Sequence, residues 1–362
     1  MESSKKSWVR YLIPGFIFQS VVIGGGYGTG AEIAQFFGVS GMKGGLLGLC
    51  VTMVIWSVIA ALTFEVARLN KAYDYGSLMK TLLGNVGSYV YDLLYWLMLF
   101  IVLGVVNATA GSMMRDLLGI NYWVGVAVLS AGIVYLVFKG TKAIEYVLSF
   151  WSYVLYAVYI LFVVFVFAKC GDNIAQSFAE PIKDGAWLTN GLQYSFYNLV
   201  VMPLFLYTVR DCETRKESFV CGALAGVLGI IPGILLLLAM GCNLPEAVKA
   251  DVPVTVIFNT LDMKWLYVIF EIVLFGTLIE TGTGFVKAFT DRVEVFMKEH
   301  GKELGGNVHT WLVVGVVLVG IAISAFGLLS LIVKGYGTAC WGFLLLYAVP
   351  VCTVGVYKIM KS

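Results

Sequence analysis

Charge is scarce in this sequence. Of its 362 residues, 13% are Asp, Glu, Lys or Arg, and 60% are hydrophobic. A soluble domain has about 25% charged residues, so roughly half of the expected charge is missing. This composition excludes water-soluble globular, disordered and nucleic-acid-binding proteins, and it predicts an integral membrane protein.

Residue types that build enzyme sites are also scarce. The chain has 2 histidines and 7 scattered cysteines, with no C-x-x-C pair that would hold zinc. H-E-x-x-H, Walker, G-x-S-x-G and G-x-G-D motifs are all missing from the sequence. We therefore expect no enzyme, no cofactor and no metal other than a coupling sodium ion.

The hydrophobic residues fall into runs long enough to cross a bilayer, which takes about 20 residues. Ten runs reach this length, with approximate bounds 11–38, 42–68, 86–115, 120–139, 143–169, 187–209, 217–241, 264–290, 310–329 and 331–358. A shorter apolar stretch, 252–261, predicts a short helix on the membrane surface. We predict an all-α membrane protein with ten transmembrane helices.

The basic residues are unevenly divided between the two sides that these spans define. With the N-terminus inside, seventeen of the 24 Lys and Arg residues lie on the inner side and six on the outer side, while Lys334 lies near an outer helix end. Cytoplasmic segments of membrane proteins carry such an excess. We therefore predict a multi-pass protein of the cytoplasmic membrane with both termini in the cytoplasm.

The longest polar break follows the fifth span and divides the chain into two halves. Residues 1–170 would form a first five-helix repeat, 171–186 an extracellular connection, and 187–362 a second five-helix repeat. Because five is odd, two similar halves would lie in opposite orientations. This is the inverted-repeat design of many secondary transporters.

The first span contains five glycines within seven residues, from Gly24 to Gly30. Each glycine costs a helix about 1 kcal/mol relative to alanine, and a membrane tolerates unwound backbone only where it lines a cavity or binds something. Close helix packing is the alternative explanation. We predict that the span is interrupted here and that its residues bind substrate: Gly24, Gly25, Gly26, Tyr27, Gly28 and Thr29.

The corresponding span of the second half carries Pro203, which removes a backbone donor. Asn198 lies near its middle, with the hydroxyls of Tyr194 and Tyr197 close by. An isolated proline often marks only a kink. Interruptions in matching spans, however, indicate a substrate site at the membrane midplane, so we predict that Tyr194, Tyr197 and Asn198 contribute to it.

Three stretches resemble the YkvI-like family of predicted amino-acid permeases: Gly24–Gly30 with Ala31 and Glu32, 279–284 (IETGTG) and 334–337 (KGYG). That family is similar to the amino acid–polyamine–organocation (APC) superfamily. The resemblance implies the five-plus-five inverted-repeat (LeuT-like) fold with helices 1 and 6 discontinuous. It also implies that spans one, three, six and eight surround the substrate.

Glu280 is the leading charged residue within a span. Thr277, Glu280 and Thr281 lie three and four positions apart, on one helical face. The resemblance implies that this face borders an ion site, with the carbonyls of Ile23 and Gly26 as partners. Glu280 would bind sodium directly or take up and release a proton; a carboxyl hydrogen-bonded to a neighbouring helix is the structural alternative.

Other polar residues within spans carry weaker predictions. Asn107 on span three would hydrogen-bond substrate, or else join two helices. Glu32, Glu271 and Lys334 fall in the outer halves of their spans and would form a gate or reach the interface independently.

These patterns predict a secondary active transporter that moves a small amino acid or related zwitterion by alternating access, coupled to a cation. The substrate carboxylate is expected at the backbone amides of Gly24–Thr29, and its amino or polar end toward Tyr194, Tyr197 and Asn198. Two other classes share these motifs: a ligand-sensing receptor on a transporter-like fold, and an ion channel.

Overall fold

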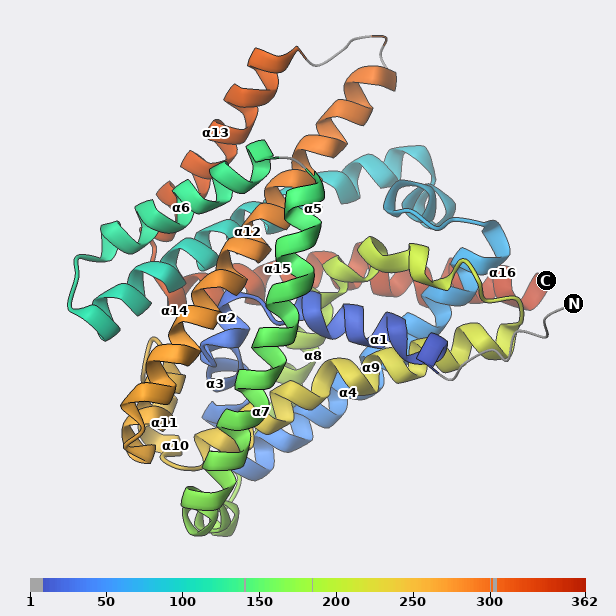
Figure 1. Cartoon of the computed structure of the whole chain (residues 1–362). Helices are drawn as coiled ribbons and strands as arrows, with labels where there is room; N and C mark the ends of the chain where they lie inside the picture. Colours follow the sequence, from blue (N-terminus) through green and yellow to red (C-terminus); the bar gives the residue numbers. More distant parts are fainter. Residues whose placement is uncertain (1–8, 140, 184, 300, 302–304) are drawn as a thin grey trace, which may run out of the picture.

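The computed structural model describes residues 9–139, 141–183, 185–299, 301 and 305–362. Throughout these residues the backbone forms helices and short connections, without strands (Figure 1). The elements up to residue 179 are α1 (Val9–Val22), α2 (Gly25–Gly28), α3 (Ala31–Phe36), η1 (Gly38–Ser40), α4 (Gly41–Asn70), α5 (Tyr75–Leu118), α6 (Tyr122–Lys139) and α7 (Thr141–Ala179). The next group is α8 (Trp187–Tyr197), η2 (Asn198–Val209), α9 (Arg215–Met240), α10 (Leu244–Ala247), α11 (Pro253–Leu261) and α12 (Lys264–Glu299). The chain ends with α13 (Gly306–Ser324), α14 (Leu328–Ser330), η3 (Leu331–Tyr336), α15 (Gly337–Phe343), η4 (Leu344–Ala348), η5 (Val351–Gly355) and α16 (Val356–Lys361).

Within the described ranges, 8 helical segments are long and apolar enough to cross a membrane. They are Ala31–Asn70, Tyr75–Leu118, Tyr122–Lys139, Ala157–Ala179, Arg215–Met240, Lys264–Lys298, Gly306–Ser324 and Leu328–Lys361. Of the predicted spans, 187–209 overlaps none of these segments, and 11–38 overlaps only the beginning of Ala31–Asn70. These are the two in which the sequence predicts an interruption.

The predicted interruption of the first span is confirmed. Helix α1 ends at Val22, and the next two residues are not helical. After the single turn α2, the chain turns again at Gly30, which has a φ of 83°. This left-handed conformation is readily available to glycine, and it lets α3 begin at Ala31 with a new direction.

The second interruption has a different form. The chain remains helical after α8 but changes to a 3-10 helix of 12 residues, η2, which contains Pro203. Runs of 3-10 helix longer than four residues are uncommon. Pro203 cannot donate a backbone hydrogen bond, so one α-helical bond is missing within this segment.

Helix α7 extends ten residues beyond the predicted end of its span, into the expected connection 171–186. The polar side chains there bind the end of α9: Asn173 donates to the Cys242 carbonyl over 2.9 Å, and Ser177 donates to the Gly241 carbonyl over 3.2 Å. These bonds satisfy carbonyls that a helix end leaves without partners. The predicted connection is therefore partly helical.

The predicted short helix 252–261 is found as α11, but its apolar residues pack on the protein. Val254, Ile257 and Leu261 are buried, and the helix contacts α7, α9 and α12. The Val254 amide donates to the Thr29 carbonyl over 3.1 Å, which fixes α11 over the interrupted first span.

Small residues let the central helices approach closely. Helices α1, α4 and α9 lie side by side (Figure 1). A Cβ atom on Gly222 of α9 would overlap the backbone of Ala61 on α4, and one on Gly226 would overlap Ser57. Close backbone approach is a common means of helix association in membranes. Helix α5 packs on α6, α12 and α13 on the other side of the interrupted span.

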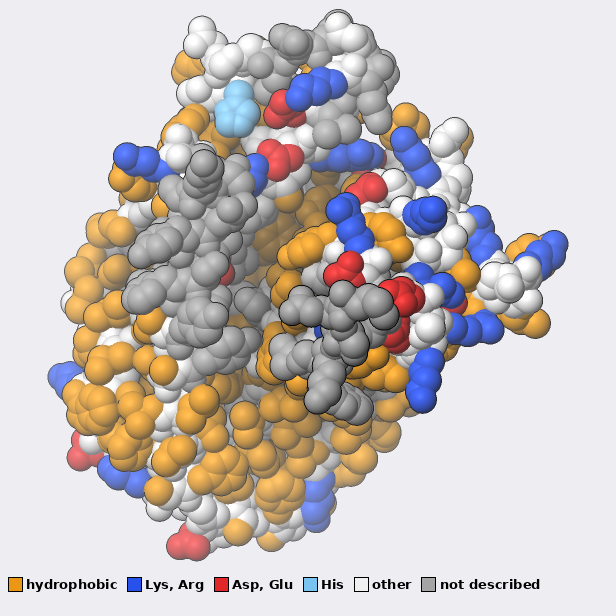
Figure 2. All heavy atoms as spheres, turned by 45° about the vertical axis from the view of Figure 1, so that its right-hand side comes forward, with side chains coloured by type: hydrophobic (Ala, Val, Ile, Leu, Met, Phe, Trp, Pro, Cys, Tyr) orange, Lys and Arg blue, Asp and Glu red, His pale blue; other side chains and the backbone are white. Residues whose placement is uncertain are grey.

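Two basic residues that the sequence predicts on the inner side, Arg10 and Arg215, make contacts between helix ends. Arg10 pairs with Glu217 at 3.2 Å, and Arg215 donates to the Ile359 carbonyl over 3.1 Å. These contacts join the beginnings of α1 and α9 to α16 near the C-terminus. Figure 2 shows a broad hydrophobic surface whose Lys and Arg side chains gather on the upper and right-hand side.

Candidate functional site

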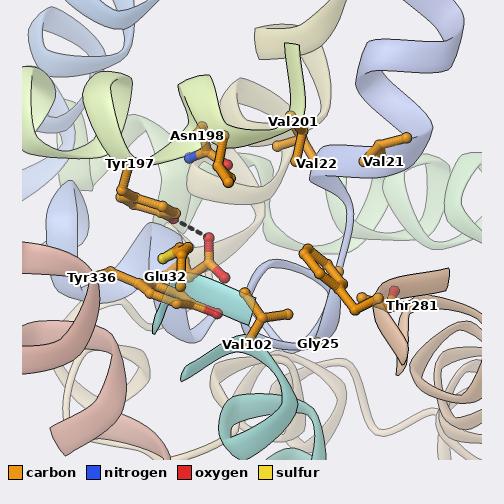
Figure 3. A pocket seen from close by; sticks show the side chains of 14 residues that line it. Val21, Val22, Gly25, Glu32, Val102, Tyr197, Asn198, Val201, Thr281 and Tyr336 are labelled. Carbon is orange, nitrogen blue, oxygen red and sulfur yellow. Dashed lines mark hydrogen bonds between the residues drawn. The ribbon is translucent and has the colours of Figure 1, made fainter. Parts of the chain in front are cut away.

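A buried cavity lies beside the interruption of the first span (Figure 3). Its polar lining consists of Glu32, Tyr197, Asn198, Thr281 and Tyr336, together with the backbone at Gly24 and Gly25. The rest of the lining is aliphatic or aromatic: Val21, Val22, Met98, Val102, Val200, Val201 and Phe285. The cavity volume is about 40 Å³, which holds a few water molecules at most.

Glu32 supplies the carboxylate of this cavity. The side chain is 5% exposed and accepts a hydrogen bond from the Tyr197 hydroxyl, 165 positions further along the chain. Figure 3 shows this bond pointing across the cavity from α3 to the end of α8. Among the described residues that line the cavity, Glu32 alone carries a formal charge.

Gly26 makes room for the Glu32 carboxylate. A Cβ atom at Gly26 would lie 2.9 Å from Glu32 Cγ and closer still to one carboxylate oxygen. The turn at Gly30 brings α3 back toward α2, so the two residues face each other although they lie six positions apart. The glycine run therefore interrupts the helix and also seats the carboxylate.

Aromatic rings surround the Glu32 carboxylate. Tyr197 and Tyr336 are stacked with ring centroids 4.5 Å apart. Behind Tyr197, the fully buried Tyr194 packs against Phe37 and Trp56, with centroid distances of 4.8 Å and 5.7 Å. Offset contacts of this kind hold rings in fixed orientations, so the tyrosine hydroxyls have defined positions around the cavity.

A larger vestibule adjoins the cavity along α12. It has a volume of about 370 Å³ and shares Val21, Thr281 and Phe285 with the cavity lining. Thr277 and Glu280 line it, and its far wall includes Lys287 and Asp291, which form an ion pair of 2.8 Å. The sequence predicts that this end of α12 lies on the cytoplasmic side.

The chain is similar to known membrane proteins in sequence and in fold. No family model matches the chain. A relative, the uncharacterized membrane protein YkvI of Bacillus subtilis, is 22% identical over 313 residues, which are 83% of this chain and 85% of YkvI. The predicted resemblance to YkvI is confirmed.

Solved structures show the same fold. MhsT in complex with L-phenylalanine is 16% identical, with a TM-score of 0.62 and coverage of 98% of both chains. A sodium-coupled sialic acid symporter is 12% identical, with a TM-score of 0.63 and coverage of 95% of this chain and 79% of the symporter. A nucleobase-cation-symport-1 family transporter with bromovinylhydantoin bound is 15% identical, with a TM-score of 0.61 and coverage of 94% and 77%. These proteins are transporters rather than enzymes, and the chain shares their LeuT-like fold.

The structure brings five of the predicted site residues together at the cavity. They are Gly24, Gly25, Tyr197, Asn198 and Thr281. Gly24 lies against Thr281, since a Cβ atom on the glycine would be 3.6 Å from the threonine methyl group. This contact joins the interrupted first span to the α12 face that carries Thr277 and Glu280.

Other predicted substrate residues lie behind the cavity wall. Tyr27, Gly28 and Tyr194 are buried outside its lining. The Thr29 hydroxyl bonds the carbonyls of Gly25 and Gly26 at 3.2 Å and 3.1 Å. The Gly26 carbonyl, predicted as an ion ligand together with that of Ile23, is thus already a hydrogen-bond acceptor.

Asn107 lies outside the cavity lining and joins α5 to α6. Its side-chain amide donates to the Leu103 carbonyl over 2.8 Å, and its side-chain oxygen accepts from Ser130 of α6 over 2.8 Å. These bonds correspond to the second of the two predictions for Asn107, that it joins two helices.

The sequence predictions left Glu32 among the weak gate candidates. The structure separates the three members of that candidate gate: Glu32 lines the cavity, Glu271 is buried beside Tyr267 near the beginning of α12, and Lys334 is exposed. In the sequence, an acidic residue shortly after a glycine run can indicate a cavity residue. This holds when, as at Gly30, the chain changes direction between the glycine run and the acid.

Proposed function

We propose that the chain is a secondary active transporter that moves a small amino acid or related zwitterion across the cytoplasmic membrane by alternating access. The observation that carries this proposal is a small cavity that contains the Glu32 carboxylate, formed where the first span is interrupted and adjoined by a larger vestibule along α12. Transporters of this architecture bind substrate at such interruptions. The likeness in fold to MhsT and to the sialic acid symporter supports the same class.

The polar groups of the cavity suggest how a zwitterion would be held. Its amino end would face Glu32, Tyr197 and Asn198, and its carboxylate would face the backbone at Gly24 and Gly25 with the Thr281 hydroxyl. This is the substrate orientation that the sequence predicts, with Glu32 as an additional partner of the amino end.

Coupling to a cation would pass through the α12 face that lines the vestibule. Glu280 and Thr281 lie there beside Thr277, whose hydroxyl bonds the Val273 carbonyl over 3.1 Å. A carboxylate in a partly hydrated vestibule can bind sodium or exchange a proton. Uptake measured under separate sodium and proton gradients distinguishes the two coupling ions.

The topology that accompanies this function has ten spans in two inverted repeats, residues 1–170 and 187–362, with both termini cytoplasmic. The two further spans would be α1–α3, whose last helix also begins the Ala31–Asn70 segment, and α8–η2. The contacts that Arg10 and Arg215 make between helix ends support this arrangement.

Reconstitution into liposomes tests the function. Purified protein is screened with the twenty amino acids for ligand-dependent thermal stabilisation, and the ligands found are then tested for uptake under imposed sodium or proton gradients. Saturable, gradient-driven uptake is expected. Binding without flux would indicate a sensor, and ion current without saturable substrate would indicate a channel.

A further inference from the structure

Among the residues that the structure describes, the cavity lining has one carboxylate and no cationic side chain to balance it. The titratable groups that face Glu32 are tyrosines: Tyr197 and Tyr194 from α8 and Tyr336 from η3, with Tyr27 of α2 behind Tyr194. Their hydroxyls are uncharged at neutral pH. Helices α5 and α12 contribute apolar and hydroxyl groups to the lining, and Lys334 on η3 is exposed away from it.

An isolated carboxylate in such surroundings is costly because it loses its hydration without gaining a counter-charge. The Tyr197 hydroxyl offsets part of this cost with one hydrogen bond. Two states of the site remain electrically neutral: Glu32 carrying a proton, or Glu32 ionised and paired with a cation from outside the protein.

The surroundings of the carboxylate suit an organic ammonium group. The Tyr197 and Tyr336 side chains line the cavity beside it, and tyrosine hydroxyl oxygens can accept hydrogen bonds from such a cation. Aliphatic side chains from α1 and α5, including Val21 and Val102, would contact an apolar body. By contrast, the lining offers a ligand carboxylate no Lys or Arg partner in the part of the chain that the structure describes.

We propose that Glu32 is a shared site for a proton and for the ammonium group of the transported ligand. In this exchange the protonated carboxyl releases its proton to solvent as R–NH₃⁺ enters, and an ammonium–carboxylate pair remains. The charge of the site is therefore the same before and after. This proposal rests on the proposed function and narrows it: the ligand carries an amine, and its carboxylate is dispensable.

Two sets of probes with a common body test the ligand class. Ethylamine, L-alanine and propionate form one set, and isoamylamine, L-leucine and 4-methylpentanoate form the other. Binding to the full-length protein is measured by calorimetry. At least one amine is expected to bind, with the matching carboxylic acid inert. Glu32→Gln should weaken amine binding by about a hundredfold or more, since an ammonium would lose its charged partner.

Proton release distinguishes exchange from a structural role of Glu32. Calorimetry in buffers of different ionisation enthalpy should show about one proton released per amine bound at a pH where free Glu32 is protonated. Glu32→Asp should retain the release with altered affinity, and Glu32→Gln should abolish it. Glu271→Gln is the matched control, because it removes another buried carboxyl outside the cavity lining, and it should leave both affinity and release unchanged.

The outcomes separate this proposal from the proposed function. Failure of both amines to bind, binding of an amine without proton release, or unchanged affinity in Glu32→Gln would overturn the shared site even if amino-acid uptake is observed. A lack of any saturable uptake in liposomes would instead overturn the transporter function, while amine binding with proton release would still support the shared site.

Discussion

Asp92 and Arg292 lie 200 positions apart and form an ion pair of 2.7 Å that joins α5 to α12. Tyr75 donates to the same carboxylate, and the Arg292 guanidinium lies 5.5 Å from the centre of the Tyr75 ring. Both charged side chains are largely buried. The pair thus joins the two helices next to the vestibule, whose lining includes Tyr95 of α5 and Asp291 of α12.

Breaking this pair should destabilise the protein. We expect Arg292→Met to lower the free energy of unfolding by about 2–5 kcal/mol, because a buried Asp92 would lose its counter-charge. Thermal unfolding of the purified protein measures the effect. Lys298→Met, which breaks the exposed pair with Glu294 on the same helix, should change stability far less, because solvent screens exposed pairs. Equal effects of the two variants would contradict a special role for the buried pair.

Adding a methyl group at Gly26 should impair ligand binding. In Gly26→Ala the new Cβ would collide with the Glu32 side chain and displace its carboxylate, so we expect affinity to fall about tenfold or more. Gly315→Ala on α13 is the control, because nothing lies within 4 Å of a Cβ there. Calorimetric titration with the best ligand checks the result. Unchanged affinity in Gly26→Ala would show that the close contact between Gly26 and Glu32 is not needed for binding.

Neutralising Glu280 should uncouple transport from the ion gradient. We expect Glu280→Gln to retain ligand binding and to lose acceleration of uptake by an imposed gradient. Uptake into liposomes is compared for sodium and proton gradients imposed separately. Glu294→Gln, on an exposed face of the same helix, serves as the control. If gradient dependence persists in Glu280→Gln, coupling resides elsewhere.

Removing the Asn107 side chain should affect stability more than affinity. Asn107→Ala deletes the bonds to Leu103 and Ser130, and hydrogen bonds between membrane helices are worth about 0.6 kcal/mol on average and up to about 1.7 kcal/mol. A lower melting temperature with ligand affinity changed by less than about twofold is expected. A large loss of affinity at constant stability would restore Asn107 as a substrate ligand.

The sequence predicts helices well where length and apolarity decide them. The span 42–68 appears as α4, Gly41–Asn70, and the five glycines correctly mark the interruption of the first span. In contrast, the extension of α7 depends on carbonyls at the end of α9, which offer no signal in α7 itself. Glu32 reaches the cavity because of the turn at Gly30 and its contact with Tyr197 from the other half of the chain. Counting residues along the first span could not predict this location.

The small volume of the cavity has a consequence for measured affinities. A space of about 40 Å³ cannot accept an amino acid until its walls move apart. Under the proposed function, the conformation seen here would exchange with a roomier, binding-competent one, which ligands would select. The apparent dissociation constant then equals the intrinsic constant divided by the competent fraction. Substitutions that merely favour the roomier conformation would tighten binding without touching the ligand.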